Sequence, residues 1–180
     1  KEHTCLLPQL GRGPDNLKGV NGYLTRADYI EILKAARARH IEVIPSFDLP
    51  GHSRAAVRSM EARYRRLMAA GKPMEAPPYR LEDPQDTTVY ASIQDYHDNT
   101  LNICLPSTYA FIDKVMESIK AMHDEAGLPL RIYHIGTDET AGAWTGSPAC
   151  QKMMAEEHVD IHQLGNSFIT KVSDILGDKG

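Results

Sequence analysis

The sequence has 180 residues, of which 42% are hydrophobic and 24% are charged, and its formal net charge is −4. This composition is that of an ordinary globular domain or of one part of such a domain. Acidic and basic residues are interspersed along the chain, so no basic stripe favours a nucleic acid and no polybasic patch favours an anionic membrane.

Signals for membranes, export and metal clusters are weak. No run of about 18 apolar residues predicts a membrane-spanning helix, and the opening KEHTCLLPQLGRG lacks the apolar segment and cleavage site of a signal peptide. We therefore expect no membrane contact from this segment. Cys5, Cys104 and Cys150 are an odd number without C-x-x-C spacing, which argues against a zinc cluster and against a dense disulfide scaffold.

The first third of the chain predicts a loop, a helix and a strand. Glycine, proline and asparagine make residues 1–24 a predicted loop. Thr25 and Asp28 have the spacing of a capping box, which predicts a helix over about 25–40. The run IEVIPSF at 41–47 is β-branched and apolar and precedes a Pro-Gly turn, so it predicts a short strand buried on both faces.

A second helix and a long connection follow. An apolar stripe after Ser53 predicts a helix that ends near Gly71. Residues 72–106 are rich in Pro, Asp, Asn and Thr. The excursion from Asp48 to Pro106 is too long for an ordinary connection, and long ordered excursions are usually functional loops or lids.

The last third predicts helices on either side of a strand. Ser107 is expected to cap a helix that ends near Gly127. The strand LRIYHIG at 130–136 follows directly, and the pair Ser-Pro at 147–148 predicts a further helix start. The apolar face from Ile161 to Leu176 belongs to a helix that ends at Gly177.

This order of elements indicates an α/β fold with parallel strands. Two predicted strands do not make a sheet that is stable alone. A (β/α)8 barrel needs about 200 residues or more. If the fold is a barrel, the chain is therefore expected to be a fragment of one.

Acidic residues and histidines follow both predicted strands. Asp48 and His52 follow the first strand, and His134, Asp138 and Glu139 lie at the end of the second. The carboxyl ends of parallel strands are where catalytic residues of α/β proteins gather. Both strand ends together therefore predict a functional site.

The adjacent carboxyls Asp138 and Glu139 are unusual for sugar chemistry. An ordinary glycosidase separates its two carboxyls by about 5–5.5 Å or about 6.5–9.5 Å. Neighbours suit a division of labour, in which one carboxyl keeps a proton as the acid and the other stays ionised. Both reach one site only if the strand ends near Gly136, because strand neighbours point to opposite faces. Alternatively, one acid caps the next helix or pairs with an arginine.

Other interpretations of these residues remain open at this point. Asp48, His52, His134 and Asp138 could supply metal ligands, although no H-x-H or H-E-x-x-H motif is present. His52 could equally be a loop histidine, and His134 a residue of the core. Trp144 could stack on a sugar ring or anchor its loop as a buried side chain. The absence of G-x-S-x-G and of phosphate-loop motifs gives no support to acyl transfer or nucleotide binding.

Two motifs together carry a resemblance. YHIGTDE at 133–139 resembles the aromatic-His-x-Gly-Gly-Asp-Glu signature of the family 20 glycoside hydrolases, the β-N-acetylhexosaminidases. IEVIPSFDLPGH at 41–52 is similar to the strand-3 motif of that family, and the likeness to bacterial chitobiases covers nearly the whole chain. The resemblance implies that residues 1–180 are a partial catalytic TIM-barrel domain, about strands 3 and 4 with flanking helices and a long loop insertion, without a second domain.

The resemblance also implies an activity. A retaining glycosidase of this kind removes non-reducing-end N-acetylglucosamine from chitobiose and chitooligosaccharides, with the 2-acetamido oxygen of the substrate as nucleophile and an oxazolinium intermediate. Glu139 matches the general acid/base and Asp138 the residue that orients the acetamide. His52, Asp48 and His134 match supporting positions. The resemblance implies no cofactor, no metal and a periplasmic, outer-membrane-associated or secreted protein of a Gram-negative bacterium.

The chain departs from the family pattern in three respects. Thr137 stands where the signature usually has its second Gly, and Ser46 where the strand-3 motif usually has Glu. The substrate-gripping arginine, the aromatic pocket and a late tyrosine belong to strands that this chain does not contain, so we expect the isolated chain to be inactive. The alternatives are a noncatalytic carbohydrate-binding or decayed barrel fragment and a metal-dependent barrel hydrolase.

Overall fold

The computed structural model describes residues 24–137, 139–140 and 142–179. Most of the predicted loop at 1–24, Cys5 and Asp138 therefore lie outside the described residues. The described elements, in chain order, are α1 (Arg26–Arg37), β1 (Ser46–Leu49), α2 (Arg54–Ala69), α3 (Pro106–Glu125), β2 (His134–Gly136), α4 (Pro148–Glu157) and α5 (Ile161–Gly177). None of the helices formed by these residues is long and apolar enough to cross a membrane.

The two strands pair in parallel, as the element order predicts. Ser46 lies opposite His134 and Leu49 opposite Gly136, with an irregularity in the register between these pairs. Parallel pairing requires a crossover connection, and α2, the long connection and α3 provide it. Both strands therefore end at the same edge of the sheet.

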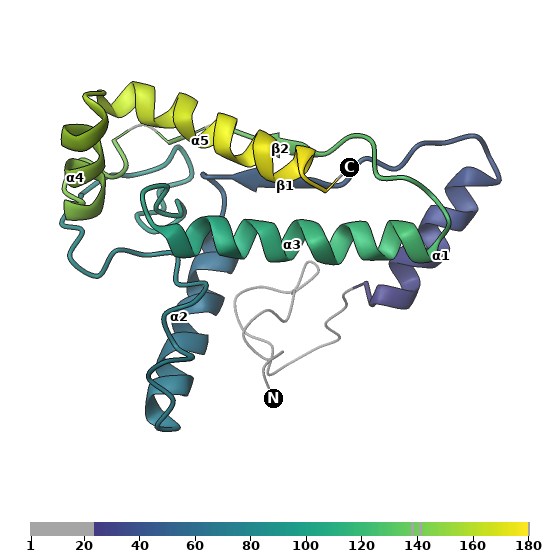
Figure 1. Cartoon of the computed structure of the whole chain (residues 1–180), viewed down its shortest axis with the longest axis horizontal. Helices are drawn as coiled ribbons and strands as arrows, with labels where there is room; N and C mark the ends of the chain where they lie inside the picture. The colour runs from purple at the N-terminus through teal and green to yellow at the C-terminus, as the bar shows by residue number, and fades with distance from the viewer. Residues whose placement is uncertain (1–23, 138, 141, 180) are drawn as a thin grey trace.

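The helices surround this strand pair unevenly (Figure 1). The long helix α3 and the C-terminal helix α5 run alongside the strands and contact each other, and α1 contacts α3 at the far end. The arrowhead of β1 points to the end of the molecule where α2 and α4 lie. The buried core is formed by side chains of α3, α5 and the long connection, among them Ile112, Met116, Phe168, Val172 and Leu101.

The first predicted strand is wrong in its extent and in its burial. β1 begins only at Ser46, and three of its four residues are exposed. Ile41, Ile44 and Phe47 expose 59%, 47% and 46% of their surface. A strand is buried on both faces only when neighbouring elements cover it, and among the described residues β1 pairs with β2 alone.

The start of α1 is confirmed. The Thr25 hydroxyl accepts a hydrogen bond from the Asp28 backbone N–H at 3.2 Å, and the Asp28 carboxylate accepts one from the Thr25 N–H at 2.8 Å. These are the two reciprocal bonds of a capping box. The Thr25 hydroxyl also donates to the Asp28 carboxylate at 2.7 Å, and this bond, together with the one from the Thr25 N–H, holds the pKa of Asp28 below its ordinary value.

The start of α3 differs from the prediction that Ser107 caps it. The helix begins at Pro106, and the Ser107 hydroxyl donates instead to the Arg80 carbonyl at 2.5 Å. Proline suits the first helical position because it needs no N–H partner there. The Ser107 hydroxyl therefore links α3 to the long connection through the Arg80 carbonyl.

The helical region after Ser147 is divided in two. α4 begins at Pro148 with Ser147 as its N-cap, as predicted, and ends at His158, whose φ of 55° is left-handed. α5 then starts with a new capping box between Asp160 and Gln163. The break follows from these local signals, because a left-handed residue ends one helix and an Asp N-cap begins the next.

The long connection before α3 has no regular secondary structure, but a disulfide and a buried hydrogen bond attach it to the region of α4. A disulfide joins Cys104 to Cys150 with a Cα separation of 5.1 Å, so the connection is tied covalently to α4. The buried Asn102 amide donates to Ser147 Oγ at 2.9 Å beside this link. The cysteine spacing spoke only against a dense disulfide scaffold and did not predict this pair. The two cysteines, far apart in the chain, are brought together by the fold.

Candidate active site

The turn after β2 has an unusual backbone. The strand ends at Gly136, and Gly136, Thr137 and Glu139 have φ values of 70°, 81° and 55°. A positive φ is rare for residues other than glycine and is a marked outlier for a β-branched one such as threonine. β2 therefore ends at the position where a strand end would allow both acids to reach one site, and positive φ values at Thr137 and Glu139 mark a sharp bend after it.

Glu139 makes two polar contacts through the same oxygen. His52 Nε2 lies 3.0 Å from Glu139 Oε2, and Gln94 Nε2 donates to that oxygen at 2.9 Å. The Glu139 side chain exposes 23% of its surface and the His52 side chain 29%. The carboxyl is thus held by two partners while part of it still faces solvent.

His52 is brought to Glu139 by the turn after β1. The Ser53 backbone N–H donates to the Asn99 carbonyl at 2.7 Å, and the Leu101 N–H donates to the Pro50 carbonyl at 3.0 Å. The Ser53 hydroxyl also donates to the Asp48 carbonyl at 2.9 Å. These bonds join the turn to the long connection and place His52, with a φ of 51°, beside the acid.

His134 and Asp48 do not join this contact. The His134 Nδ1 lies 2.9 Å from the Ser46 hydroxyl, across the strand pair. Asp48 is exposed near the end of β1 and lines a cleft of about 730 Å³ between β1, α2 and α3, which His52 also lines. His134 therefore supports the strand pair, whereas Asp48 lies on the wall of the cleft next to His52.

Trp144 occupies the position of a loop anchor. Its side chain is buried, with 6% of its surface exposed, and the indole N–H donates to the Leu101 carbonyl at 3.0 Å. Stacking on a sugar requires one open ring face. The contacts seen here are those of the alternative interpretation, in which Trp144 fixes the loop after Glu139 to the core.

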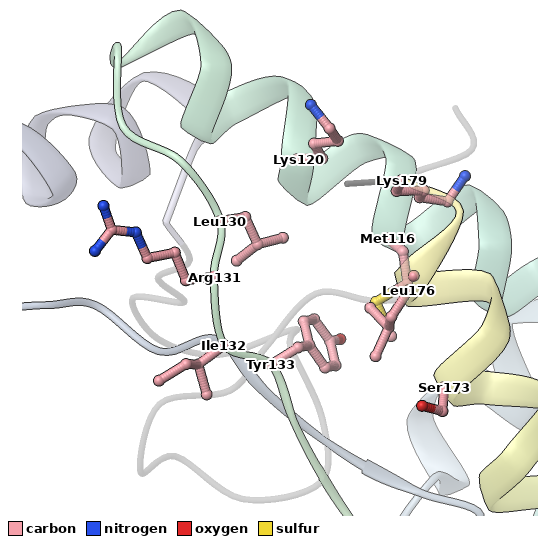
Figure 2. A pocket seen from close by; sticks show the side chains of 10 residues that line it. Met116, Lys120, Leu130, Arg131, Ile132, Tyr133, Ser173, Leu176 and Lys179 are labelled. Carbon is pink, nitrogen blue, oxygen red and sulfur yellow. The ribbon is translucent and has the colours of Figure 1, made fainter.

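A smaller cavity of about 330 Å³ lies away from this site, between α3, α5 and the segment before β2. In Figure 2, Leu130 and Tyr133 point toward Met116 and Leu176, whereas Arg131 and Ile132 point to the other side. Burial raises the pKa of Tyr133. The lining of this cavity includes none of the predicted site residues, so the candidate active site is the edge that carries Glu139.

The sequence left open whether the site holds a metal ion. Among the residues that the structure describes, no group of three or more His, Cys, Asp and Glu side chains is arranged to hold one.

Gln94 was not predicted as a site residue. The sequence indicated that its connection was functional, but a single exposed glutamine in an irregular segment carries no motif.

The catalytic-domain model of glycosyl hydrolase family 20 matches residues 6–180 of this chain. The chain belongs to glycosyl hydrolase family 20. It is 55% identical over 179 residues to the beta-hexosaminidase B of Pseudoalteromonas piscicida, covering 99% of this chain and 23% of that protein. It is 44% identical over 211 aligned positions to the N,N'-diacetylchitobiase of Vibrio harveyi, covering 100% of this chain and 24% of that protein.

Solved structures of family 20 show the same fold. The exo beta-N-acetylglucosaminidase of Vibrio harveyi in complex with N-acetylglucosamine superposes with a TM-score of 0.74 at 35% identity, covering 92% of this chain and 23% of that one. This family 20 chain thus spans about a quarter of the length of the relatives that it matches. Its two parallel strands with flanking helices are part of a TIM-barrel-type domain.

Proposed function

We propose that the parent chain, meaning a polypeptide that carries these residues within a catalytic domain of the length of its relatives, is a β-N-acetylhexosaminidase. The observation that carries this proposal is the contact of Glu139 with His52 at the carboxyl ends of two parallel strands, 3.0 Å between Oε2 and Nε2. A partly buried, oriented carboxyl at this edge is suited to general acid/base catalysis. The family membership supports the same reading.

Glu139 is the proposed proton donor to the oxygen of the leaving sugar. Both described contacts of its carboxyl involve Oε2, which leaves Oε1 to carry the proton. After the first step the same group, now ionised, takes a proton from the attacking water. A donor of this kind contributes about 100- to 10,000-fold to the rate.

Asp138 is the proposed partner of the substrate acetamide. It lies outside the described residues, so its role rests on the signature at 133–139 and on chemistry. An ionised carboxylate beside the acetamide nitrogen would orient the acetamide oxygen toward the anomeric carbon and stabilise the positive charge that develops. Substrate assistance of this type removes the need for two carboxyls on opposite sides of the bond.

The proposed substrates are chitobiose and short chitooligosaccharides, cleaved with retention to release N-acetylglucosamine from the non-reducing end. The chitobiase of Vibrio harveyi and the N-acetylglucosamine complex of a Vibrio neighbour support this choice. We also propose an export destination, periplasmic, outer-membrane-associated or secreted. The disulfide between Cys104 and Cys150 supports it, because disulfides persist in oxidising compartments.

The decisive experiment compares Glu139→Gln with the unmodified parent chain on two substrates. Chitobiose has a poor leaving group that needs a proton, whereas 4-nitrophenyl N-acetylglucosaminide has a good one that does not. We expect kcat for chitobiose to fall by about 1,000-fold and kcat for the aryl substrate to fall far less. Glu42→Gln, an exposed glutamate before β1, is the matched control and should leave both rates unchanged.

Other outcomes would point to other functions. Full chitobiose turnover by Glu139→Gln would contradict the assignment of the acid. A parent chain that binds chitobiose without cleaving it would favour a noncatalytic carbohydrate-binding module. Loss of turnover on treatment with a chelator, restored by a divalent cation, would favour a metal-dependent hydrolase.

A further inference from the structure

The contact between Gln94 and Glu139 joins two segments that are 45 positions apart in the chain. Gln94 lies in the irregular connection between α2 and α3, and Glu139 follows β2. A glutamine side-chain nitrogen can only donate hydrogen bonds. Its 2.9 Å contact therefore makes Glu139 Oε2 an acceptor, and it leaves the other carboxyl oxygen to hold a proton.

A closed turn holds Gln94 in place. The Ser92 N–H donates to the Tyr96 carbonyl at 2.9 Å, and the Asp95 N–H donates back to the Ser92 carbonyl at 2.9 Å. The Ser92 hydroxyl accepts from the Tyr96 N–H at 3.2 Å. Gln94 lies in the middle of this turn, so its backbone position is determined by bonds on both sides.

The turn is also linked to α2, which begins at Arg54, two positions after His52. Asp98 accepts a hydrogen bond from Arg54 Nε at 2.7 Å and a second one from Arg58. The Arg54 guanidinium lies 5.2 Å from the centre of the Tyr96 ring. Burial opposes the charge of Asp98, but the two arginines hold its pKa below the ordinary value. The segment that carries Gln94 and the segment that carries His52 are therefore held together.

We propose that Gln94 is a positioning residue for the general acid: it orients the Glu139 carboxyl by binding Oε2, so that Oε1 presents the proton to the leaving oxygen. This inference rests on the proposed function of Glu139. A donor that fixes the carboxyl matters most when proton transfer limits the rate. Its loss should therefore slow substrates with poor leaving groups selectively.

The test uses Gln94→Met in the parent chain, because methionine keeps the length of the side chain and removes both N–H donors. Gln85→Met, an exposed glutamine earlier in the same connection, is the matched control. We expect Gln94→Met to lower kcat for chitobiose about tenfold and to leave kcat for 4-nitrophenyl N-acetylglucosaminide within about twofold. Gln85→Met should change neither rate.

A second variant, Gln94→Glu, provides a readout that loss of structure alone would not change. A carboxylate beside Glu139 favours retention of the proton by like-charge repulsion, so the basic limb of the pH–rate profile for chitobiose should move to higher pH. Gln85→Glu should leave the profile in place. Thermal unfolding midpoints of all four variants show whether each is folded.

Equal losses on both substrates with Gln94→Met, or no loss on either, would overturn the positioning role, as would an unmoved profile with Gln94→Glu. The proposed function fails in a different way, namely if Glu139→Gln itself shows no dependence on the leaving group. If Glu139→Gln selectively lowers kcat for chitobiose and Gln94→Met does not, the proposed function holds and Gln94 is not a positioning residue.

Discussion

The Ser46 hydroxyl lies 2.9 Å from His134 Nδ1, and these two residues are also paired across the strands. The strand pair is therefore bonded through side chains at the level where β2 begins. The side chain that makes this cross-strand link is short and uncharged, and it stands where the strand-3 motif of the family usually has Glu.

Ser46→Ala should remove this link and lower the free energy of unfolding of the parent chain by about 1 kcal/mol, the net contribution of one hydrogen bond. Urea unfolding measures the change. Ser173→Ala, at an exposed serine of α5, is the control and should change stability by less than about 0.5 kcal/mol. Equal stabilities of the two variants would contradict a stabilising role for the link.

Thr137→Gly should stabilise the parent chain, because Thr137 has a φ of 81° in a region that favours glycine. A non-glycine residue there costs about 1–2 kcal/mol, and part of the gain is offset by the greater freedom of glycine in the unfolded state. We expect a net gain of about 0.5–1 kcal/mol in chemical denaturation. Thr145→Gly, at an exposed threonine of the same loop without a positive φ, should instead destabilise. A loss at both positions would rule out strain at Thr137.

Breaking the Cys104–Cys150 disulfide should destabilise the link between the long connection and α4. The two cysteines are 46 positions apart, and closing a loop of this size in the unfolded chain is worth about 2–4 kcal/mol. The double variant Cys104→Ser, Cys150→Ser should have a lower melting temperature than the unmodified protein. A reductant should not lower the melting temperature of this double variant further. If the unmodified protein and the double variant melt alike under oxidising conditions, the disulfide does not stabilise the protein.

The buried His123 should make the packing of α1 on α3 sensitive to acid. Burial lowers the pKa of His123, although the neighbouring Asp124 works in the opposite direction. The neutral ring, 3.2 Å from the Tyr29 hydroxyl, is the folded form. Its contribution is fully present above the ordinary histidine pKa of about 6.5 and is lost as the pH falls below that value.

His123→Gln should therefore flatten the loss of stability as the pH falls below about 6.5. The free energy of unfolding, measured at several pH values, tests this. His162→Gln, at an exposed histidine of α5, should leave the slope unchanged. A slope that persists in His123→Gln would assign the acid sensitivity to other groups.

The isolated chain of 180 residues should not hydrolyse 4-nitrophenyl N-acetylglucosaminide, because it spans 23% of the length of its Pseudoalteromonas relative. The remaining pocket residues of a barrel come from other strands. The absorbance of released 4-nitrophenolate, followed with the purified chain, measures this, and turnover above the rate of a protein-free blank would contradict it.

Local patterns were enough to predict much of this protein. The capping box at Thr25, the helix start at Ser147 and the parallel order of the strands are short-range signals, and the structure confirms them. The end of β2 at Gly136 meets the condition that the sequence set for two adjacent acids to serve one site. The family followed from two short motifs, and the family model matches residues 6–180.

The relations between distant segments were decided by tertiary structure alone. Nothing in the sequence near Gln94 indicates that it meets Glu139, or that Cys104 meets Cys150. Such contacts depend on how a long connection folds back over the strand edge, and this is determined by the sum of many weak contacts rather than by periodicity. The burial of Trp144 has the same origin, whereas Phe47 is exposed because, among the described residues, β1 pairs with β2 alone. The sequence by itself determined which groups could act at the strand ends, and the fold determined which of them touch.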